Sequence, residues 1–103
     1  MKRFSVLYLL KERYHHLSCN THSEAKSILQ KLLTDEKRTP IGIYDAKTEL
    51  FEWEPTRQRD YNQAGIEGQG KLGDHIITIV EALRRRDADW QKASEFQRTS
   101  FFA

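Results

Sequence analysis

Residues 3–10 are rich in β-forming side chains, and apolar residues recur at every second position from Phe4 to Leu10, which predicts a β-strand. Most of its apolar side chains fall on one face, while Leu7 and Leu9 fall on the other. Because both faces carry apolar residues, we expect this strand to be central in a sheet or covered on both sides. The charged segment Lys11–Arg13 then predicts a hairpin turn, and residues 14–19 predict a second strand, for which a polar loop is the alternative.

The clearest single element is a predicted hairpin near the middle of the chain. Ile41 and Ile43 are expected on one face of its first strand, and Phe51 and Trp53 on one face of its second strand. Asp45 opens the connection, because its carboxylate can accept a hydrogen bond from the backbone N–H two residues on. The pattern therefore predicts a type I turn between two antiparallel strands.

Two helices are predicted from their start signals and their apolar faces. Thr21 and Glu24 have the spacing of a capping box. The apolar residues behind it have the spacing of one helical face: Ala25, Ile28, Leu29, Leu32 and Leu33. Asp74 is predicted to cap the second helix, whose expected buried face consists of Ile76, Ile77, Val80 and Leu83. Arg84–Arg86 are expected to end this helix, because cations interact favourably with the C-terminal end of the helix dipole.

The segment before the second helix, residues 55–73, gives a weaker pattern. Its four glycines together cost several times ~1 kcal/mol of helix propensity, which favours a loop with one irregular turn. A helix is the alternative. Small and apolar residues fall on one seam at near-heptad spacing: Tyr61, Gly65, Gly68, Leu72, Ile76, Ile79 and Leu83.

These elements predict a small α+β protein. Their order is β-β-α-β-β-α, or β-α-β-β-α if residues 14–19 form a loop. We expect a largely antiparallel sheet with both helices packed on one of its faces. This domain is predicted to span residues 1–89, and residues 90–103 are predicted to form an aromatic C-terminal tail.

Size and composition narrow the class of protein further. A chain of 103 residues supports a single domain, and its net charge of +2 is too small to identify a nucleic-acid or membrane binder. Cys19 is the single cysteine, which excludes an internal disulfide and fits a reducing compartment. The apolar run of residues 4–10 ends at charged residues, not at a cleavage site, and no other stretch is long enough to span a bilayer. We therefore expect a soluble, cytoplasmic protein without a membrane partner.

One cluster of residues could bind a metal ion. His16, Cys19 and His22 are possible ligands, and zinc requires three or four such groups in tetrahedral arrangement. Their spacing matches no known zinc finger, and no second ligand pair follows downstream. A solvated strand and turn is therefore the favoured interpretation of this segment.

Other catalytic or cofactor signals are weak, and no cofactor is expected. Gly68–Gly73 has the spacing of the dinucleotide fingerprint, but the strand that must precede the fingerprint is missing. Glu52 and Glu54 are assigned to a hydrophilic outer face of their strand. No Ser-His-Asp arrangement is recognised in the sequence. Whether the protein is an enzyme stays open, and the sequence favours a protein that is not.

A protein-interaction or adaptor module that self-associates, as a homodimer, is the first functional expectation. Small antiparallel sheets expose edges that pair with other chains, and aromatic residues outside a core mark contact sites. Trp90, Phe101 and Phe102 are hard to place in so small a core, so they are the expected partner-binding residues.

Two alternatives come from other classes. The first is a nucleic-acid-binding module in which arginines contact phosphate while neighbouring aromatic residues stack on bases. Its expected residues are Arg57, Arg59, Arg84, Arg85 and Arg86. The second is a metal-binding protein or enzyme at His16, Cys19 and His22.

Overall fold

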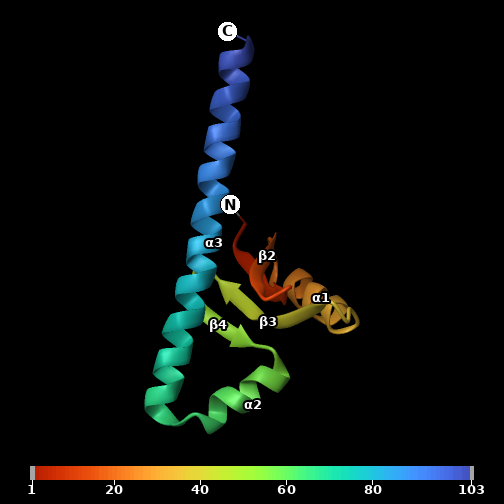
Figure 1. The fold of residues 1–103 in the computed structure, drawn as a ribbon, viewed down its shortest axis with the longest axis vertical. Coiled ribbons are helices and arrows are strands. Elements are labelled where there is room, and N and C mark those ends of the chain that lie inside the picture. Colours follow the sequence, from red (N-terminus) through yellow and green to blue (C-terminus); the bar gives the residue numbers. More distant parts are fainter. Residues whose placement is uncertain (1, 103) are drawn as a thin grey trace.

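A four-stranded antiparallel sheet with three helices forms the fold in the computed structural model, which describes the backbone of residues 2–102 and the side chains of residues 2–87. The elements in chain order are β1 (Phe4–Leu10), β2 (Arg13–Cys19), α1 (His22–Leu33), β3 (Arg38–Asp45), β4 (Leu50–Trp53), α2 (Pro55–Gln63) and α3 (Gly65–Phe102). The strand order is β2-β1-β3-β4, so β2 and β4 are the edges of the sheet (Figure 1). The predicted α+β class and antiparallel sheet are confirmed, and residues 14–19 are a strand.

The two long helices lie on opposite faces of the sheet, although the sequence placed both on one face. Val6 and Ile43 pack with α1, whereas Leu7 and Tyr44 pack with α3, so the sheet separates two apolar clusters. The physical reason is the alternation in β1, because neighbouring residues of a strand point to opposite faces. A sheet that is apolar on both faces needs a cover on each side.

A β-bulge at Ile41 changes the expected pattern in β3. Leu7 pairs with Gly42 and Tyr8 pairs with Pro40, so Ile41 is the extra residue on the β3 side. The bulge shifts the alternation by one position. Ile41 therefore packs on the α3 side while Ile43 packs on the α1 side, and their predicted common face is wrong. Phe51 and Trp53 do share a face, with ring centroids 4.9 Å apart.

The two hairpins close with different turns. Between β1 and β2, Lys11 and Glu12 both have positive φ, at 51° and 64°, which is the backbone of a two-residue type I′ turn. Between β3 and β4, the Asp45 carboxylate accepts a hydrogen bond from the Lys47 N–H at 3.0 Å, as the sequence predicted. Asp45 also receives two hydrogen bonds from the Arg3 guanidinium, at 2.8 and 2.7 Å, which tie the start of β1 to this turn.

The start of α1 confirms the predicted cap, and α2 corrects the predicted loop. The Thr21 hydroxyl accepts from the Glu24 N–H at 3.2 Å. After β4, the buried Glu54 carboxylate accepts from the N–H groups of Thr56 and Arg57, and Pro55 stands at the first helical position, where its missing N–H costs nothing. Glu54 is thus a helix cap and does not lie on a hydrophilic outer strand face.

Helix α3 is much longer than the sequence predicted. It begins at Gly65, so Asp74 lies inside it and caps nothing, and it continues through Arg84–Arg86, which were expected to end it. Its predicted apolar face is confirmed, because Ile76 and Val80 are buried against the sheet and Ile77 and Leu83 pack around them. The predicted domain boundary between residues 89 and 90 falls inside this helix.

Candidate functional site

A partly buried polar network between the sheet and α3 is the most distinctive cluster of functional groups in the described part of the chain. His16 of β2 has a side chain that is only 4% exposed, and both of its ring nitrogens are occupied. Its Nε2 lies 2.5 Å from Asp87 Oδ2, and its Nδ1 lies 3.2 Å from Ser5 Oγ. Arg84 donates to Ser5 Oγ at 2.6 Å and to the backbone oxygen of Lys2 at 2.8 Å.

One direction of hydrogen bonding satisfies every member of this network. Arg84 can only donate, so Ser5 Oγ accepts from Arg84, and its own proton can be donated to His16 Nδ1. In this arrangement His16 Nε2 carries a proton and donates it to Asp87. No buried side-chain nitrogen or oxygen among the described residues lacks a hydrogen-bond partner, which agrees with this arrangement.

The network has the residue types of a Ser-His-Asp triad but not the accessibility of one. Ser5 is fully buried, and its oxygen already accepts a charged hydrogen bond from Arg84. A nucleophile must reach its substrate, which the buried Ser5 does not, and the contacts of this network join α3 to β1 and β2. Sequence analysis missed it because Ser5, His16 and Asp87 come from three elements and share no local spacing.

Tyr44 extends the polar contacts along α3. Its hydroxyl donates to Glu81 Oε1 at 3.1 Å, and Arg84 lies over its ring at 5.9 Å from the centroid. Burial, and then the hydrogen bond to Glu81, raise the pKa of Tyr44 to about 12. The phenol therefore stays neutral well above its ordinary range.

The structure does not bring the predicted metal ligands together. Cys19 is buried on the α1 side of the sheet, whereas His16 points to the α3 side, where both of its nitrogens are bonded. His22 is exposed and bonds Glu52. Burial, and then the negative charge of Glu24, raise the pKa of the Cys19 thiol, which disfavours the thiolate that binds metals. Among the described residues there is no group of three or more side chains suited to a metal ion.

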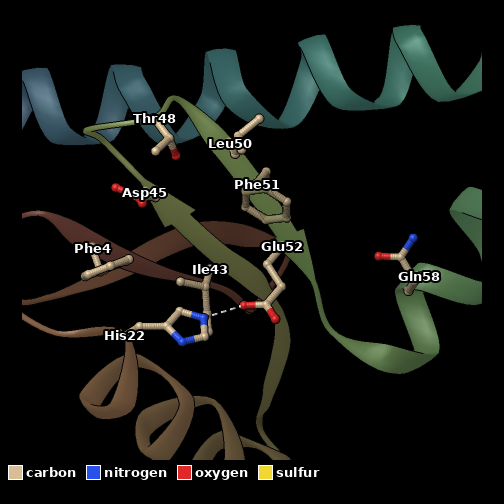
Figure 2. Close-up of a pocket in the computed structure, with 9 residues that line it drawn as sticks. All are labelled: Phe4, His22, Ile43, Asp45, Thr48, Leu50, Phe51, Glu52 and Gln58. Atoms are coloured by element: carbon tan, nitrogen blue, oxygen red, sulfur yellow. Dashed lines mark hydrogen bonds and ion pairs between the residues drawn. The ribbon is translucent and has the colours of Figure 1, made fainter.

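An open groove lies between the start of α1 and strand β4 (Figure 2). It has a volume of about 500 Å³ and an apolar lining that includes Phe4 and Ile43. His22 Nε2 and Glu52 Oε2 meet across it at 2.8 Å, with about half of each side chain exposed. Lys26 adds a longer contact to Glu52, at 3.7 Å. An exposed ion pair of this kind contributes little stability and does not assign a chemical reaction to the groove.

The predicted nucleic-acid-binding arginines fall into two separate groups. Arg57 and Arg59 belong to α2, and Arg57 borders a hollow beside Leu72. Arg84 lies twelve residues beyond Leu72 on α3, which corresponds to about 18 Å of helix rise. Arg84 is engaged in the polar network, and Arg85 and Arg86 beside it are exposed. The structure therefore places these arginines in two groups, one on α2 and one on α3.

The predicted partner-binding residues, Trp90, Phe101 and Phe102, lie outside the residues whose side chains the structure describes. Comparison of this chain with protein-family models, with curated proteins and with solved structures finds no match. Within the part of the chain that the structure describes, no helix is both long enough and apolar enough to cross a membrane.

Proposed function

We propose that this protein is a non-enzymatic interaction module that assembles with a second copy of itself. The main observation behind this proposal is the length of helix α3. Between Leu72 and Asp87 it packs on the sheet, but it then continues to Phe102 as a projection that stands clear of the sheet (Figure 1). We call residues 88–102 the overhang, and at about 1.5 Å per residue they rise roughly 22 Å.

The length and composition of the overhang support a partner surface. An isolated helix of this length is marginal in water, because helices are stabilised mainly by packing of an apolar face. The overhang contains four aromatic residues: Trp90, Phe96, Phe101 and Phe102. A surface supplied by another chain would give this helix an apolar face on which to pack.

A second copy is the favoured partner on two grounds. The net charge of +2 is small, so electrostatic repulsion between copies is weak. In addition, the beginning of α3 exposes apolar side chains, with Ile66 91% exposed and Leu72 40% exposed. One copy therefore combines an overhang whose sequence is rich in aromatic residues with exposed apolar positions at the start of α3.

Sedimentation equilibrium or light scattering of the full chain tests the proposal. We expect a dimer, and we expect Trp90→Glu combined with Phe101→Glu to shift it to the monomer, with the same expected for Phe102→Glu to a smaller extent. The matched control, Ser23→Glu with Ser27→Glu, adds the same charge at exposed positions of α1 and should leave the dimer intact. A wild-type chain that is monomeric at all accessible concentrations would refute the proposal.

A further inference from the structure

Strand β2 is an edge without the usual protection against pairing. It is seven residues long, Arg13–Cys19, and pairs with β1 in continuous register without a bulge. It contains no proline and no lysine, the residues with which proteins commonly block an edge. The opposite edge is blocked, because β4 has four residues, carries Glu52, and is followed directly by Glu54 and Pro55.

The hydrogen-bond pattern identifies the free backbone groups of β2. Ala46 donates to the Arg3 oxygen at 3.0 Å, so odd-numbered residues of β1 direct their backbone groups toward β3 and even-numbered residues toward β2. Through the β1–β2 register, the odd-numbered residues of β2 bond to β1. The N–H and C=O groups of Tyr14, His16 and Ser18 therefore point outward from the sheet.

Helix α3 leaves the sheet across this same edge. Asp87 is joined to His16 of β2, and the overhang begins at the next residue. In Figure 1 the helix passes β4 and β3 before it reaches the level of β2, and the overhang projects beyond. Any chain that pairs with β2 on the outside would therefore lie under or beside the overhang.

We propose that β2 pairs antiparallel with β2 of a second copy, about a two-fold axis at His16. In this register His16 faces its own equivalent, and Tyr14 faces Ser18 of the second copy, so every outward N–H and C=O group finds a partner. The two sheets become one sheet of eight strands, and the half-exposed Leu17 becomes covered at the junction. This inference rests on the proposed self-association and specifies its interface.

The same register gives the overhang a place to pack. The His16 side chain contacts Ser5 of β1, and Ser5 pairs with Ser18 of β2. Helix α3 is therefore placed over the half of β2 that contains Ser18, to one side of the two-fold axis. The two α3 helices can then run antiparallel on either side of the axis. Beyond Ser18 lies Tyr14 of the second copy, which borders a hollow of about 160 Å³ together with Leu9 and Leu72. In the proposed dimer the overhang therefore lies beside the hollow that Leu9, Tyr14 and Leu72 of the second copy line.

Neither the β2–β2 pairing nor the packing of the overhang buries enough area for a stable dimer on its own. A stable interface buries about 1,600 Å² in total, and one pair of seven-residue strands buries much less than that. The strand pairing supplies register and hydrogen bonds, and the overhang supplies apolar area. The proposal thus accounts for two unusual features of the chain, an unblocked edge strand and a helix longer than its sheet.

The first test removes one outward-pointing N–H group of β2 and leaves the hydrogen bonds between β1 and β2 in place. In Ser18→Pro the lost N–H is one that points outward, whereas Ser18→Ala keeps that N–H and removes only the hydroxyl. We expect Ser18→Pro to raise the dimer dissociation constant roughly ten- to a hundredfold, because two intermolecular hydrogen bonds are lost by symmetry. Ser18→Ala should behave as the wild type.

The second test fixes the register and does not depend on how well the proline variant folds. His15 faces Leu17 of the second copy as a non-hydrogen-bonded pair, with Cα atoms about 4.5 Å apart, which suits a disulfide. We expect His15→Cys with Leu17→Cys to form a covalent dimer on oxidation, while each single variant does not. A wild-type dimer that yields no such cross-link, or that survives Ser18→Pro, would overturn the β2 interface and leave self-association standing. A monomeric wild type would refute both proposals.

Discussion

Replacing glycine by alanine is expected to have opposite effects at two positions of this fold. Gly42 of β3 faces Trp53 of β4 on the α3 side of the sheet. A Cβ atom built on Gly42 would lie 2.3 Å from the backbone oxygen of Glu52 and 2.6 and 2.8 Å from two ring atoms of Phe51. A Cβ atom built on Gly70 of α3 meets nothing within 4 Å.

The expected change in stability at each glycine depends on which atoms an added Cβ atom would displace. At Gly42 the nearest atom is a carbonyl oxygen of the paired strand, which cannot retreat without loosening the β3–β4 pairing, and the Phe51 ring is held edge-on against Trp53. Overpacking of this kind costs about 1–3 kcal/mol, and we place Gly42→Ala at the upper end, about 3 kcal/mol. At Gly70 alanine gains about 0.5–1 kcal/mol, because it restricts the unfolded chain and favours the helix.

Urea unfolding followed by circular dichroism measures both variants on one scale. We expect a lower unfolding midpoint for Gly42→Ala and a higher one for Gly70→Ala, with an unchanged dependence on urea concentration. A neutral Gly42→Ala variant would contradict the close approach of β3 and β4. A destabilised Gly70→Ala variant would contradict the helical start of α3 and would favour the loop that the glycines suggested.

Three further outcomes are expected. Lys11→Asn with Glu12→Gly should stabilise the protein by about 1–2 kcal/mol in the same urea assay, since both residues hold a positive φ that asparagine and glycine adopt readily, whereas alanine at both positions should give no gain. Because its folded pKa is about 12, Tyr44 should favour the folded state up to pH about 10 and lose that contribution as the pH rises to about 12, and Tyr44→Phe should make the unfolding free energy flatter over this range. The Arg3 guanidinium, chiefly by its hydrogen bond, holds the pKa of Asp45 well below its usual range, so stability should fall as the pH drops below about 4, and Arg3→Gln should make this acid dependence shallower.

The sequence predicted those elements whose signals are local. Alternation located the strands, the capping box located the start of α1, and Asp45 located the turn after β3, because each depends on residues that are neighbours along the chain. The bulge at Ile41 has no such signal, since only the pairing with β1 defines it. The apolar residues on both faces of β1 require a cover on each side, and the two helices supply it from opposite faces.

The segment between Glu54 and Ile76 is helical although the sequence favoured a loop, because packing outweighs its low helix propensity. Its glycines lower the helix propensity, yet the buried cap at Glu54 starts α2, and Ile76 and Val80 hold α3 on the sheet. Tyr61 stacks on Trp53 with ring centroids 5.3 Å apart, which fastens α2 to β4. Contacts at both ends therefore support the glycine-containing turns between them. The local sequence predicted that Arg84–Arg86 end the helix. In the structure Arg84 and Asp87 bond to residues of the sheet, and the helix continues beyond them.

The polar network links the stability of the fold to the proposed assembly. Apolar contacts at Ile76 and Val80 hold α3 on the sheet but are not directional, whereas the hydrogen bonds among Ser5, His16, Arg84 and Asp87 fix where the helix leaves it.

Ser5→Ala tests this role, because it removes the hydroxyl that Arg84 and the buried His16 side chain share. We expect it to destabilise the protein by about 1–3 kcal/mol in urea unfolding. We also expect it to weaken the dimer in sedimentation equilibrium, although Ser5 lies outside the proposed β2 interface. Leu32→Val, a cavity variant on the α1 side, is the control, since it should lower stability by a similar amount without weakening the dimer. If both variants weakened the dimer equally, the network would contribute only stability, and the direction of the overhang would have to be set by apolar packing alone.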